Sequence, residues 1–412
     1  MLSAFPTNRS YACLLILWIG LSSAGCGSNV VKQTEAEPRL AANEQVPPTS
    51  LPMWLGTPAR NFYGSGPWPD RPPAVIWEFE TELISGRLHK EGWGGSSWPG
   101  QPSVSGQRVF FGSADGYVYC LDNQDGRLLW SFKAADSLKT TPTIAGNRLI
   151  ASGLDHYIYC LDVNDGSLIW KYKTGFEVDS SPAIIDGRIY FGGEDGYFYC
   201  LKLEDGTLEY KTARLGSMEG SFSVVAGRVY IGTEQGDLYC LALTDGSVLW
   251  KATIGADSNS TPAVANGFVY TAAEDGYVYC FSQADGQLSW KFKADGGLSR
   301  IYKERSGFWA SPIVKGSRVY IGSNNGLLYC LSSEKGEVIW QHQVRGPIWG
   351  TSPVVDGRVV FGDKAGWLYM LSAEDGQRLW ELKIGENVNA TPAILGGRIY
   401  IGAFNGKLFC LG

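Results

Sequence analysis

Cysteine is the residue type in this chain whose spacing most suggests chemistry. Apart from two longer intervals, the side chains recur every 40 residues, at Cys120, Cys160, Cys200, Cys240, Cys280, Cys330 and Cys410. Thiolates at such positions could act as nucleophiles, as metal ligands or in disulfides. However, no Cys-x-x-Cys pair occurs. Equivalent positions of neighbouring packed sheets lie about 10 Å apart, whereas a disulfide requires Cα atoms within about 7 Å. We therefore expect buried, reduced thiols that act as small core residues.

The other residue types that support catalysis form no recognisable constellation. The histidines His89, His156 and His342 are scattered along the chain, and neither a nucleophile elbow nor a phosphate-binding loop is present. The chain has 35 Lys plus Arg against 41 Asp plus Glu, a formal net charge of −6. Because there is also no basic run, nucleic acid is excluded as an expected partner. We expect no catalytic residue and no metal site.

The elements that hold these residues are short strands. Between residues 140 and 170, four runs rich in β-branched and aromatic residues are separated by turns such as Asp155-His156 and Asp165-Gly166. Asp-Gly or Asn-Gly recurs at the turn before the tyrosine-cysteine pair, and this dipeptide suits a tight hairpin. No run shows helical spacing of apolar residues. The sequence therefore predicts an all-β repeat of four antiparallel strands.

The period of the repeat predicts how these sheets are assembled. Eight copies of about 40 residues favour an eight-bladed β-propeller over residues 71–412, because a single small sheet cannot bury both of its faces. The last repeat stops at Gly412, before its fourth strand. The strand at 74–79, which contains Trp77, is predicted to supply that strand and so to close the ring without an open edge.

One motif in the repeat resembles that of a known family. The run from Cys120 to Trp130 reads Cys-Leu-Asp-Asn-Gln-Asp-Gly-Arg-Leu-Leu-Trp and recurs at 160–170, 200–210, 240–250, 280–290, 330–340 and 370–380. It resembles the tryptophan-docking motif of the pyrroloquinoline-quinone (PQQ) type propellers, Ala-x-Asp-x-x-x-Gly-x-x-x-Trp. The resemblance implies that an aromatic ring from each blade stacks on the motif glycine of a neighbouring blade. These structural docking residues are Trp77, Trp130, Trp170, Tyr210, Trp250, Trp290, Trp340 and Trp380.

Two rings of charge accompany the repeat. Arginines open the second strands at Arg108, Arg148, Arg188, Arg228, Arg318, Arg358 and Arg398, and aspartates lie in the turns before the fourth strands at Asp125, Asp165, Asp205, Asp245, Asp285 and Asp375. These turns share one face of a propeller. We expect the two rings to form alternating surface ion pairs, which stabilise a fold only weakly.

The N-terminal 70 residues are expected to lie outside the fold. Residues 1–25 read as a signal peptide, with Arg9 followed by an apolar stretch too short to span a bilayer. Ala-Gly-Cys26 resembles a bacterial lipobox, which implies lipidation at Cys26 and attachment to the periplasmic face of the outer membrane. Ser23 stands where that motif has Leu, so cleavage by ordinary signal peptidase stays an alternative. Residues 26–70 are rich in Pro, Ala, Ser and Glu and predict a flexible tether.

Function is expected where the repeats differ. Two enlarged connections, at about 82–101 and 295–310, lie at the same mouth of the central channel in a propeller. Mixed aromatic and arginine side chains are typical of protein interfaces. The predicted partner-binding residues are Trp93, Trp98, Arg300, Tyr302, Arg305, Phe308, Trp309 and Trp349. The alternative is that Trp93, Trp98 and Trp309 merely plug the channel.

Two function classes follow from these observations. The layout is similar to that of BamB-like outer-membrane assembly lipoproteins, which implies a monomeric, non-enzymatic scaffold that binds envelope proteins and needs no cofactor. The alternatives are a PQQ-dependent dehydrogenase and a propeller that binds a sugar or another ligand. Acids near the channel mouth, at Glu177, Asp179, Glu219 and Asp257, leave a site for PQQ and Ca²⁺ open. The dehydrogenases, however, are longer, and many have an adjacent Cys-Cys pair that is absent here.

Overall fold

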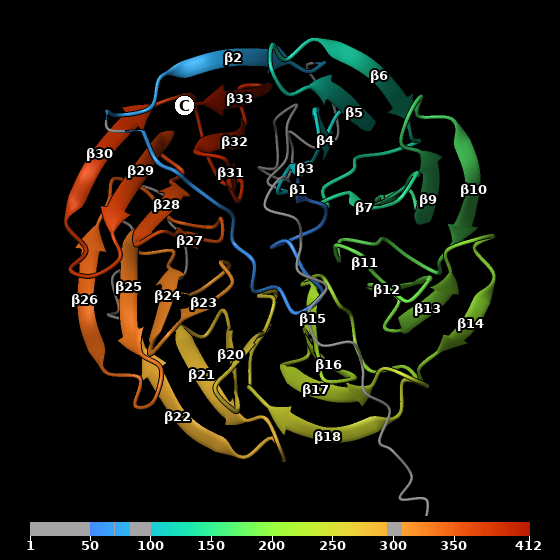
Figure 1. The fold of residues 1–412 in the computed structure, drawn as a ribbon. Helices are drawn as coiled ribbons and strands as arrows, with labels where there is room; N and C mark the ends of the chain where they lie inside the picture. Colours follow the sequence, from blue (N-terminus) through green and yellow to red (C-terminus); the bar gives the residue numbers. More distant parts are fainter. Residues whose placement is uncertain (1–49, 70, 83–99, 295–306) are drawn as a thin grey trace, which may run out of the picture. The chain divides into compact units, whose positions relative to one another are not determined.

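The computed structural model describes residues 50–69, 71–82, 100–294 and 307–412. Every regular element in these ranges is a β-strand, and they contain no helix of the length and apolarity that crossing a membrane requires. The strands form eight antiparallel sheets arranged as the blades of an eight-bladed propeller (Figure 1). The predicted fold class is therefore confirmed.

The first four blades follow one another along the chain. Blade 1 contains β1 (Ser50–Leu51), β3 (Ser103–Ser105), β4 (Arg108–Gly112), β5 (Tyr117–Asp122) and β6 (Leu128–Lys133). Blade 2 contains β7 (Thr143–Ala145), β8 (Arg148–Ser152), β9 (Tyr157–Asp162) and β10 (Leu168–Lys173). Blade 3 contains β11 (Ala183–Ile185), β12 (Arg188–Gly192), β13 (Phe198–Lys202) and β14 (Leu208–Lys211). Blade 4 contains β15 (Phe222–Val225), β16 (Arg228–Gly232), β17 (Asp237–Ala242) and β18 (Val248–Thr253).

The remaining blades keep the same order, and the last takes a strand from the start of the chain. Blade 5 contains β19 (Ala263–Ala265), β20 (Phe268–Ala272), β21 (Tyr277–Ser282) and β22 (Leu288–Lys293). Blade 6 contains β23 (Ile313–Lys315), β24 (Arg318–Gly322), β25 (Leu327–Ser332) and β26 (Val338–Gln343). Blade 7 contains β27 (Val354–Val355), β28 (Arg358–Gly362), β29 (Trp367–Ser372) and β30 (Arg378–Lys383). Blade 8 contains β31 (Ala393–Leu395), β32 (Arg398–Ala403), β33 (Lys407–Leu411) and β2 (Val75–Glu80).

The last blade closes the ring as the sequence predicts. Strand β2 pairs with β33, so that Trp77 lies opposite Cys410 and Phe79 opposite Leu408. This pairing places the first long strand of the chain on the outside of the last sheet (Figure 1). The free edge that β33 would otherwise expose is thereby covered.

The core lies between the blades. In the third strand of each blade four consecutive side chains are buried, as in Val118 to Leu121 of β5, because both faces of the sheet pack against neighbouring blades. The repeat cysteines belong to these runs, and all seven are buried and free. The expectation of reduced structural thiols is confirmed. Burial raises the pKa of Cys120 to about 12 and that of Cys200 to about 11.

Aromatic docking joins neighbouring blades at seven of the eight joints of the ring. A Cβ atom added to Gly126 would lie 2.6 Å from the Trp77 ring, and one added to Gly166 would lie 2.5 Å from Trp130, so only glycine permits this approach. Such contacts pair Trp77 with Gly126, Trp130 with Gly166, Trp170 with Gly206, Tyr210 with Gly246, Trp250 with Gly286, Trp290 with Gly336 and Trp340 with Gly376. Seven of the eight predicted docking rings thus lie against a glycine of the next blade, and no such contact is seen for Trp380 among the described residues.

Four arginines of the ring, Arg108, Arg228, Arg318 and Arg398, serve the same joints, which corrects the expectation of alternating ion pairs. Arg108 donates to the carbonyl of Val163 in the next blade at 2.7 Å, and the Trp130 indole donates to the same oxygen at 3.1 Å. Arg318 and Trp340 share the Ala373 carbonyl in the same way. The turn aspartates instead accept backbone N–H groups of their own turns, because an Asx turn satisfies their carboxylates locally.

Residues 50–69 are packed inside the propeller, which corrects their assignment to a flexible tether. Strand β1 pairs with β3 on the inner edge of blade 1, and Leu51, Trp54, Leu55 and Tyr63 are buried. These apolar residues have neither helical nor strand periodicity, so the sequence pattern does not reveal their burial. The predicted signal peptide, Cys26 and the remainder of the tether lie outside the described residues.

Candidate functional site

The channel axis holds a cavity to which every blade contributes. It has a volume of about 160 Å³. Its lining comes mainly from the connections that lead from the outer strand of one blade to the innermost strand of the next. The residues at the start of the innermost strands are Gly100, Lys139, Asp179, Glu219, Asn259, Trp309, Trp349 and Asn389. Apart from Gly100, which lies one residue further along its repeat, these positions share one phase of the repeat. Their chemical differences therefore make an uneven site from a symmetric scaffold.

In blades 2 to 8 a row of hydroxyl side chains supports the cavity, two residues after the lining residue of each blade. The Thr141 amide donates to Ser181 Oγ at 3.1 Å, and the Ser181 amide donates to Ser221 Oγ at 2.8 Å. Blades 5 to 8 continue the pattern from Thr261 to Ser311, from Ser311 to Thr351 and from Thr351 to Thr391. These buried bonds link adjacent blades and fix the positions of the lining residues.

The N-terminal segment contributes to the cavity and fills much of the channel. Trp54 lines the cavity, and its carbonyl accepts a 2.8 Å bond from the guanidinium of Arg60. Arg60 is fully buried and also donates to the carbonyls of Phe222 and Ser181, in blades 4 and 3. Burial lowers the pKa of Arg60 to about 9. A buried cation without a carboxylate partner is costly, so the carbonyl oxygens that surround it are essential.

An aromatic wall forms the side of the cavity at blades 6 and 7. The rings of Trp309 and Trp349 lie 4.4 Å apart between centroids at an angle of 33°, and the Lys364 ammonium lies 3.9 Å from the centre of the Trp349 ring. Both indoles were predicted to face a protein partner, and they meet at the cavity instead of standing apart on the surface. Phe308 is fully buried against Tyr329, so its ring is not available to a partner.

An acidic wall lies opposite, at blades 2 to 4. Lys139 Nζ and Asp179 Oδ2 form an ion pair of 2.9 Å whose side chains are 17% and 7% exposed. Burial, followed by the charge of Asp179, raises the pKa of Glu219 to about 7 and that of Glu194 to about 8. The cavity lining therefore contains the Lys139–Asp179 ion pair and the Glu219 carboxyl group, which takes up a proton near neutral pH.

Several buried polar atoms at the cavity have no hydrogen-bond partner within the part of the chain that the structure describes. They are Nε1 of Trp54, Oδ1 of Asp179, Oδ1 of Asn259, and both Oδ1 and Nδ2 of Asn389. Asn389 is 2% exposed and Trp54 is 9% exposed. Buried polar groups are almost always satisfied in folded proteins. Their convergence on one cavity identifies the position where water or a ligand completes the structure.

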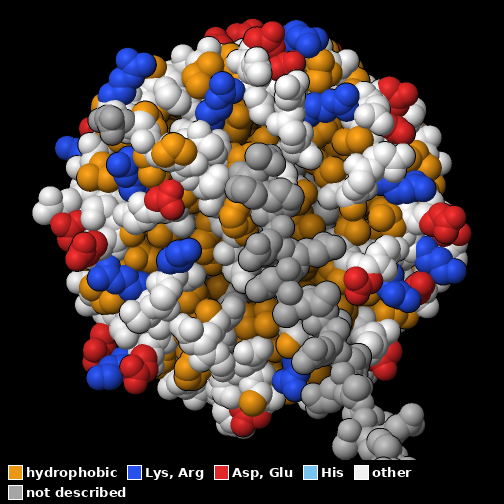
Figure 2. All heavy atoms as spheres, in the orientation of Figure 1, with side chains coloured by type: hydrophobic (Ala, Val, Ile, Leu, Met, Phe, Trp, Pro, Cys, Tyr) orange, Lys and Arg blue, Asp and Glu red, His pale blue; other side chains and the backbone are white. Residues whose placement is uncertain are grey.

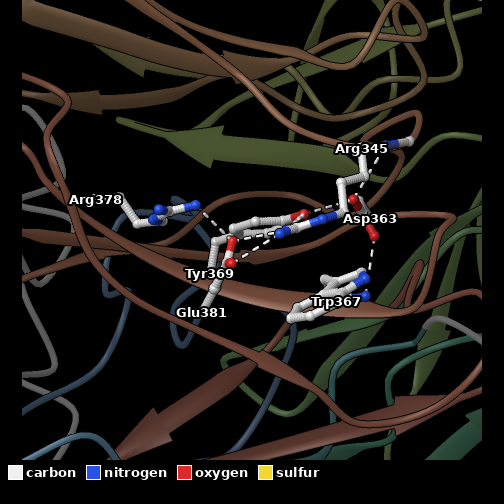
Figure 3. A network of polar contacts seen from close by, with 7 residues as sticks. Arg345, Asp363, Trp367, Tyr369, Arg378 and Glu381 are labelled. Carbon is white, nitrogen blue, oxygen red and sulfur yellow. Dashed lines mark hydrogen bonds and ion pairs between the residues drawn. The ribbon is translucent and has the colours of Figure 1, made fainter.

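A polar network in blade 7 positions the loop that leads to Trp349 (Figure 3). Asp363 accepts bonds from the Tyr369 hydroxyl at 2.9 Å and from the Gly346 amide at 3.1 Å. Arg345 binds both carboxylate oxygens of Glu381, at 2.7 and 2.8 Å, and lies 3.9 Å from the centre of the Trp367 ring. In blades 1, 3 and 5 the aspartate of the Asp-Gly turn accepts the tyrosine hydroxyl, as Asp195 does from Tyr199 at 2.6 Å. The two recurring dipeptides therefore act as one hydrogen-bonded unit.

The family profile described as "Outer membrane protein assembly factor BamB" matches residues 72–292, 211–348 and 276–411. The chain belongs to this family. The matched ranges together extend from β2, which closes the ring, to the last strand of the BamB-family propeller. A comparison with curated proteins found no match.

Solved structures with the same fold include a BamB protein, an alcohol dehydrogenase and a computationally designed protein. BamB from Moraxella catarrhalis is 19% identical, with a TM-score of 0.53 over 77% of this chain and 84% of that one. Quinohemoprotein alcohol dehydrogenase from Comamonas testosteroni is 13% identical, with a TM-score of 0.71 over 88% and 80%. The computationally designed protein Ika8 is 15% identical, with a TM-score of 0.67 over 82% and 98%. At these identities the similarity concerns the fold alone.

The cavity fits a PQQ and Ca²⁺ site poorly. Its volume of about 160 Å³ is below the range of about 300–1,000 Å³ that is usual for cofactor and drug-sized ligands. Asp179 is held by Lys139. Within the described ranges no group of three or more His, Cys, Asp or Glu side chains could hold a metal ion, whereas Ca²⁺ takes six to eight oxygen ligands.

The sequence predictions cover part of this site. Trp309, Trp349, Asp179 and Glu219 were singled out and line the cavity. Trp93, Trp98, Arg300, Tyr302 and Arg305 lie outside the described residues. Trp54, Asn259 and Asn389 were missed. The residue type varies between repeats at the position that Lys139 occupies, and this variation could have revealed the two asparagines. Trp54 lies outside the repeats, so no comparison of repeats could have revealed it.

Proposed function

We propose that this protein is a non-enzymatic lipoprotein of the cell envelope whose propeller binds partner proteins during outer-membrane protein assembly. The observation that carries the proposal is the match of the BamB family profile to residues 72–411 in overlapping segments. Eight blades that dock on one another through aromatic rings form a stiff platform, which is the property that a scaffold needs.

The filled channel supports a scaffold over an enzyme. Arg60 and Tyr63 donate to the carbonyls of Phe222 and Val314, in blades 4 and 6, so the N-terminal segment cross-links distant parts of the ring. Large insertions are the usual source of a closed active site on a propeller. Here the channel is occupied by the chain itself, and the remaining cavity is small.

The partner surface is proposed at the mouth of the cavity. The two enlarged connections contain Trp93, Trp98, Arg300, Tyr302 and Arg305, and they lead directly into the cavity residues Gly100 and Trp309. On the face shown in Figure 2, most charged side chains lie towards the rim and hydrophobic side chains are frequent nearer the middle. Aromatic and arginine residues contribute most to the energy of protein interfaces.

Anchoring follows from the N-terminal sequence. Lipidation at Cys26 after removal of residues 1–25 would place the propeller on the periplasmic face of the outer membrane. Two or more acyl chains hold a protein firmly, whereas one gives only marginal attachment. The protein is expected to act as a monomer, with no nucleic acid and no contact with the membrane apart from the lipid.

Capture of partners from native membranes tests the proposal. Lipidated full-length protein is purified after mild cross-linking, beside a Trp93→Ala, Arg300→Ala double variant and a Glu204→Ala control on the opposite face. We expect the wild type and the control to retain the same envelope proteins and the double variant to lose them at an unchanged melting temperature. Equal capture by all three proteins would contradict this surface.

Enzyme activity is tested separately. Purified protein is incubated with PQQ and Ca²⁺ and supplied with alcohols or sugars and an electron-accepting dye. We expect no dye reduction, since the cavity residues fit the cofactor poorly. Turnover that depends on PQQ would replace the scaffold proposal with the dehydrogenase alternative.

A further inference from the structure

We propose that the axial cavity binds one neutral polyhydroxyl ligand, namely a single sugar ring or a small polyol. This inference goes beyond the proposed scaffold function and does not depend on it. It is drawn from the size of the cavity, its unpartnered polar atoms, its charge balance and its aromatic wall.

The size of the cavity limits the class of ligand. A cavity needs only about 10–15 Å³ to hold one water molecule, whereas drug-sized ligands occupy about 300–1,000 Å³. The observed volume of about 160 Å³ lies between these limits. A peptide segment or a multi-ring cofactor is too large, and a single small ring is of the right scale.

The unpartnered atoms require a ligand that both donates and accepts hydrogen bonds. Trp54 Nε1 is a donor, Oδ1 of Asp179 and of Asn259 are acceptors, and the Asn389 amide offers one of each. The Trp54, Asp179 and Asn389 side chains are at least nine-tenths buried. A hydroxyl group can donate and accept at once, so several hydroxyls on one small ligand can satisfy this mixed set. Leaving such groups unsatisfied is costly.

The charge of the lining favours a neutral ligand. Lys139 and Asp179 neutralise each other across 2.9 Å. Burial and the Asp179 charge raise the pKa of Glu219 to about 7, so its carboxyl group is protonated in a large fraction of molecules at neutral pH. A charged ligand would lose its hydration here without gaining a full counter-charge. Neutral hydroxyl groups pay no comparable penalty.

The aromatic wall suits the apolar faces of a sugar ring. The indoles of Trp309 and Trp349 line the cavity beside Asn259 and Asn389. A sugar ring presents C–H groups on its faces and hydroxyls at its edge, so it can contact an aromatic surface while its edge reaches polar atoms. The two indoles thus lie together on one side of the axis, between Asn259 and Asn389, and the other side of the cavity is polar.

Calorimetry on the purified full-length chain tests the proposal. The probes are neutral monosaccharides, small polyols, a neutral trisaccharide, and charged analogues, namely a uronic acid and an amino sugar. We expect saturable binding of at least one neutral probe, with the charged analogue of that sugar at least about tenfold weaker. Binding of the monosaccharide alone indicates a free sugar as the ligand, whereas equal binding of the trisaccharide indicates the end of a glycan.

Substitutions locate the ligand. Asn259→Ala and Asn389→Ala are each expected to weaken binding about tenfold, as the loss of one net hydrogen bond implies. Asn164→Ala, at an exposed turn on the opposite face, is the matched control and should bind like the wild type. If Asn389→Ala does not fold, saturation-transfer NMR of the wild type with the same probes supplies the test. No binding of any neutral probe, preference for a charged analogue, or unchanged affinity in folded asparagine variants would each overturn the proposal.

Discussion

Replacing Glu219 by glutamine should stabilise the protein at alkaline pH and leave it unchanged at acidic pH. Glu219 lines the axial cavity, where burial and the nearby Asp179 charge raise its pKa from 4.5 to about 7. Glutamine has nearly the same shape and cannot ionise. The substitution therefore removes the cost of burying the charged form while it preserves the packing.

The sign and size of the effect follow from proton linkage. The folded state binds the proton more tightly than the unfolded state, so the stability linked to Glu219 is fully present below pH 4.5. It is lost as pH rises through about 7. One pKa unit corresponds to about 1.4 kcal/mol, so the shift corresponds to about 3 kcal/mol. At pH 8.5 the Glu219→Gln variant should exceed the wild type by up to about 3 kcal/mol, and at pH 4.5 the two should be equal.

Denaturant unfolding at a series of pH values between 4.5 and 8.5 measures this difference. Glu337→Gln, at an exposed turn of blade 6, is the control: it measures how replacing a glutamate by glutamine changes stability at an exposed position. Glu194 is retained in both proteins, but the Glu219 charge contributes to its raised pKa. The difference between wild type and variant therefore reports Glu219 together with its interaction with Glu194. A variant that is no more stable at pH 8.5, or that gains equally at pH 4.5, would refute the reasoning.

Four further predictions concern the chain ends, the channel and the thiols. Deletion of residues 1–49 should leave the melting temperature nearly unchanged, whereas deletion of residues 1–69 should lower it strongly, because Trp54, Arg60 and Tyr63 are lost; equal melting temperatures would contradict the packing of residues 50–69. Arg60→Ala should lower the free energy of unfolding, measured with urea, by about 3–5 kcal/mol, because buried carbonyl groups lose their hydrogen-bond donor. The seven repeat cysteines should resist a thiol reagent at pH 8 in the native state and react fully in denaturant, because burial raises their pKa values; native labelling would contradict their burial. Cys26→Ser should abolish membrane sedimentation and the mass of the attached lipid, and a soluble wild-type protein would favour ordinary secretion.

The repeat made the fold predictable from the sequence. Eight aligned copies define the strands, and the missing fourth strand of the last copy leaves β2 as the only complement. The docking rings followed from fixed spacing between a small residue, a glycine and an aromatic residue. The prediction of a ring of ion pairs was wrong. The position in the repeat gives the face on which Arg108 and Asp125 lie, but it does not show that the guanidinium of Arg108 binds the Val163 carbonyl in place of a carboxylate.

The site was less predictable than the fold. Glu219 and Trp349 could be placed at the channel mouth because their phase in the repeat fixes their position. The segment around Arg60 belongs to no repeat, and its apolar residues are irregular, so composition suggested a tether. Its burial depends on carbonyl groups of blades 3, 4 and 6, which become neighbours only when the ring is closed. No local pattern contains that information.

The strand that closes the ring also sets the order in which the protein can fold. Thr81, just beyond the end of β2, donates to the carbonyl of Gly406, which is 325 residues away, and Trp77 lies opposite Cys410. A chain synthesised from its N-terminus therefore cannot finish blade 8 until β33 has been made. Contacts of such long sequence separation form slowly, because loop-closure entropy opposes them. The ring of blades should consequently remain open until β33 has been made, and an open ring is compatible with threading through an export channel. Unfolding should become cooperative only when β2 pairs with β33.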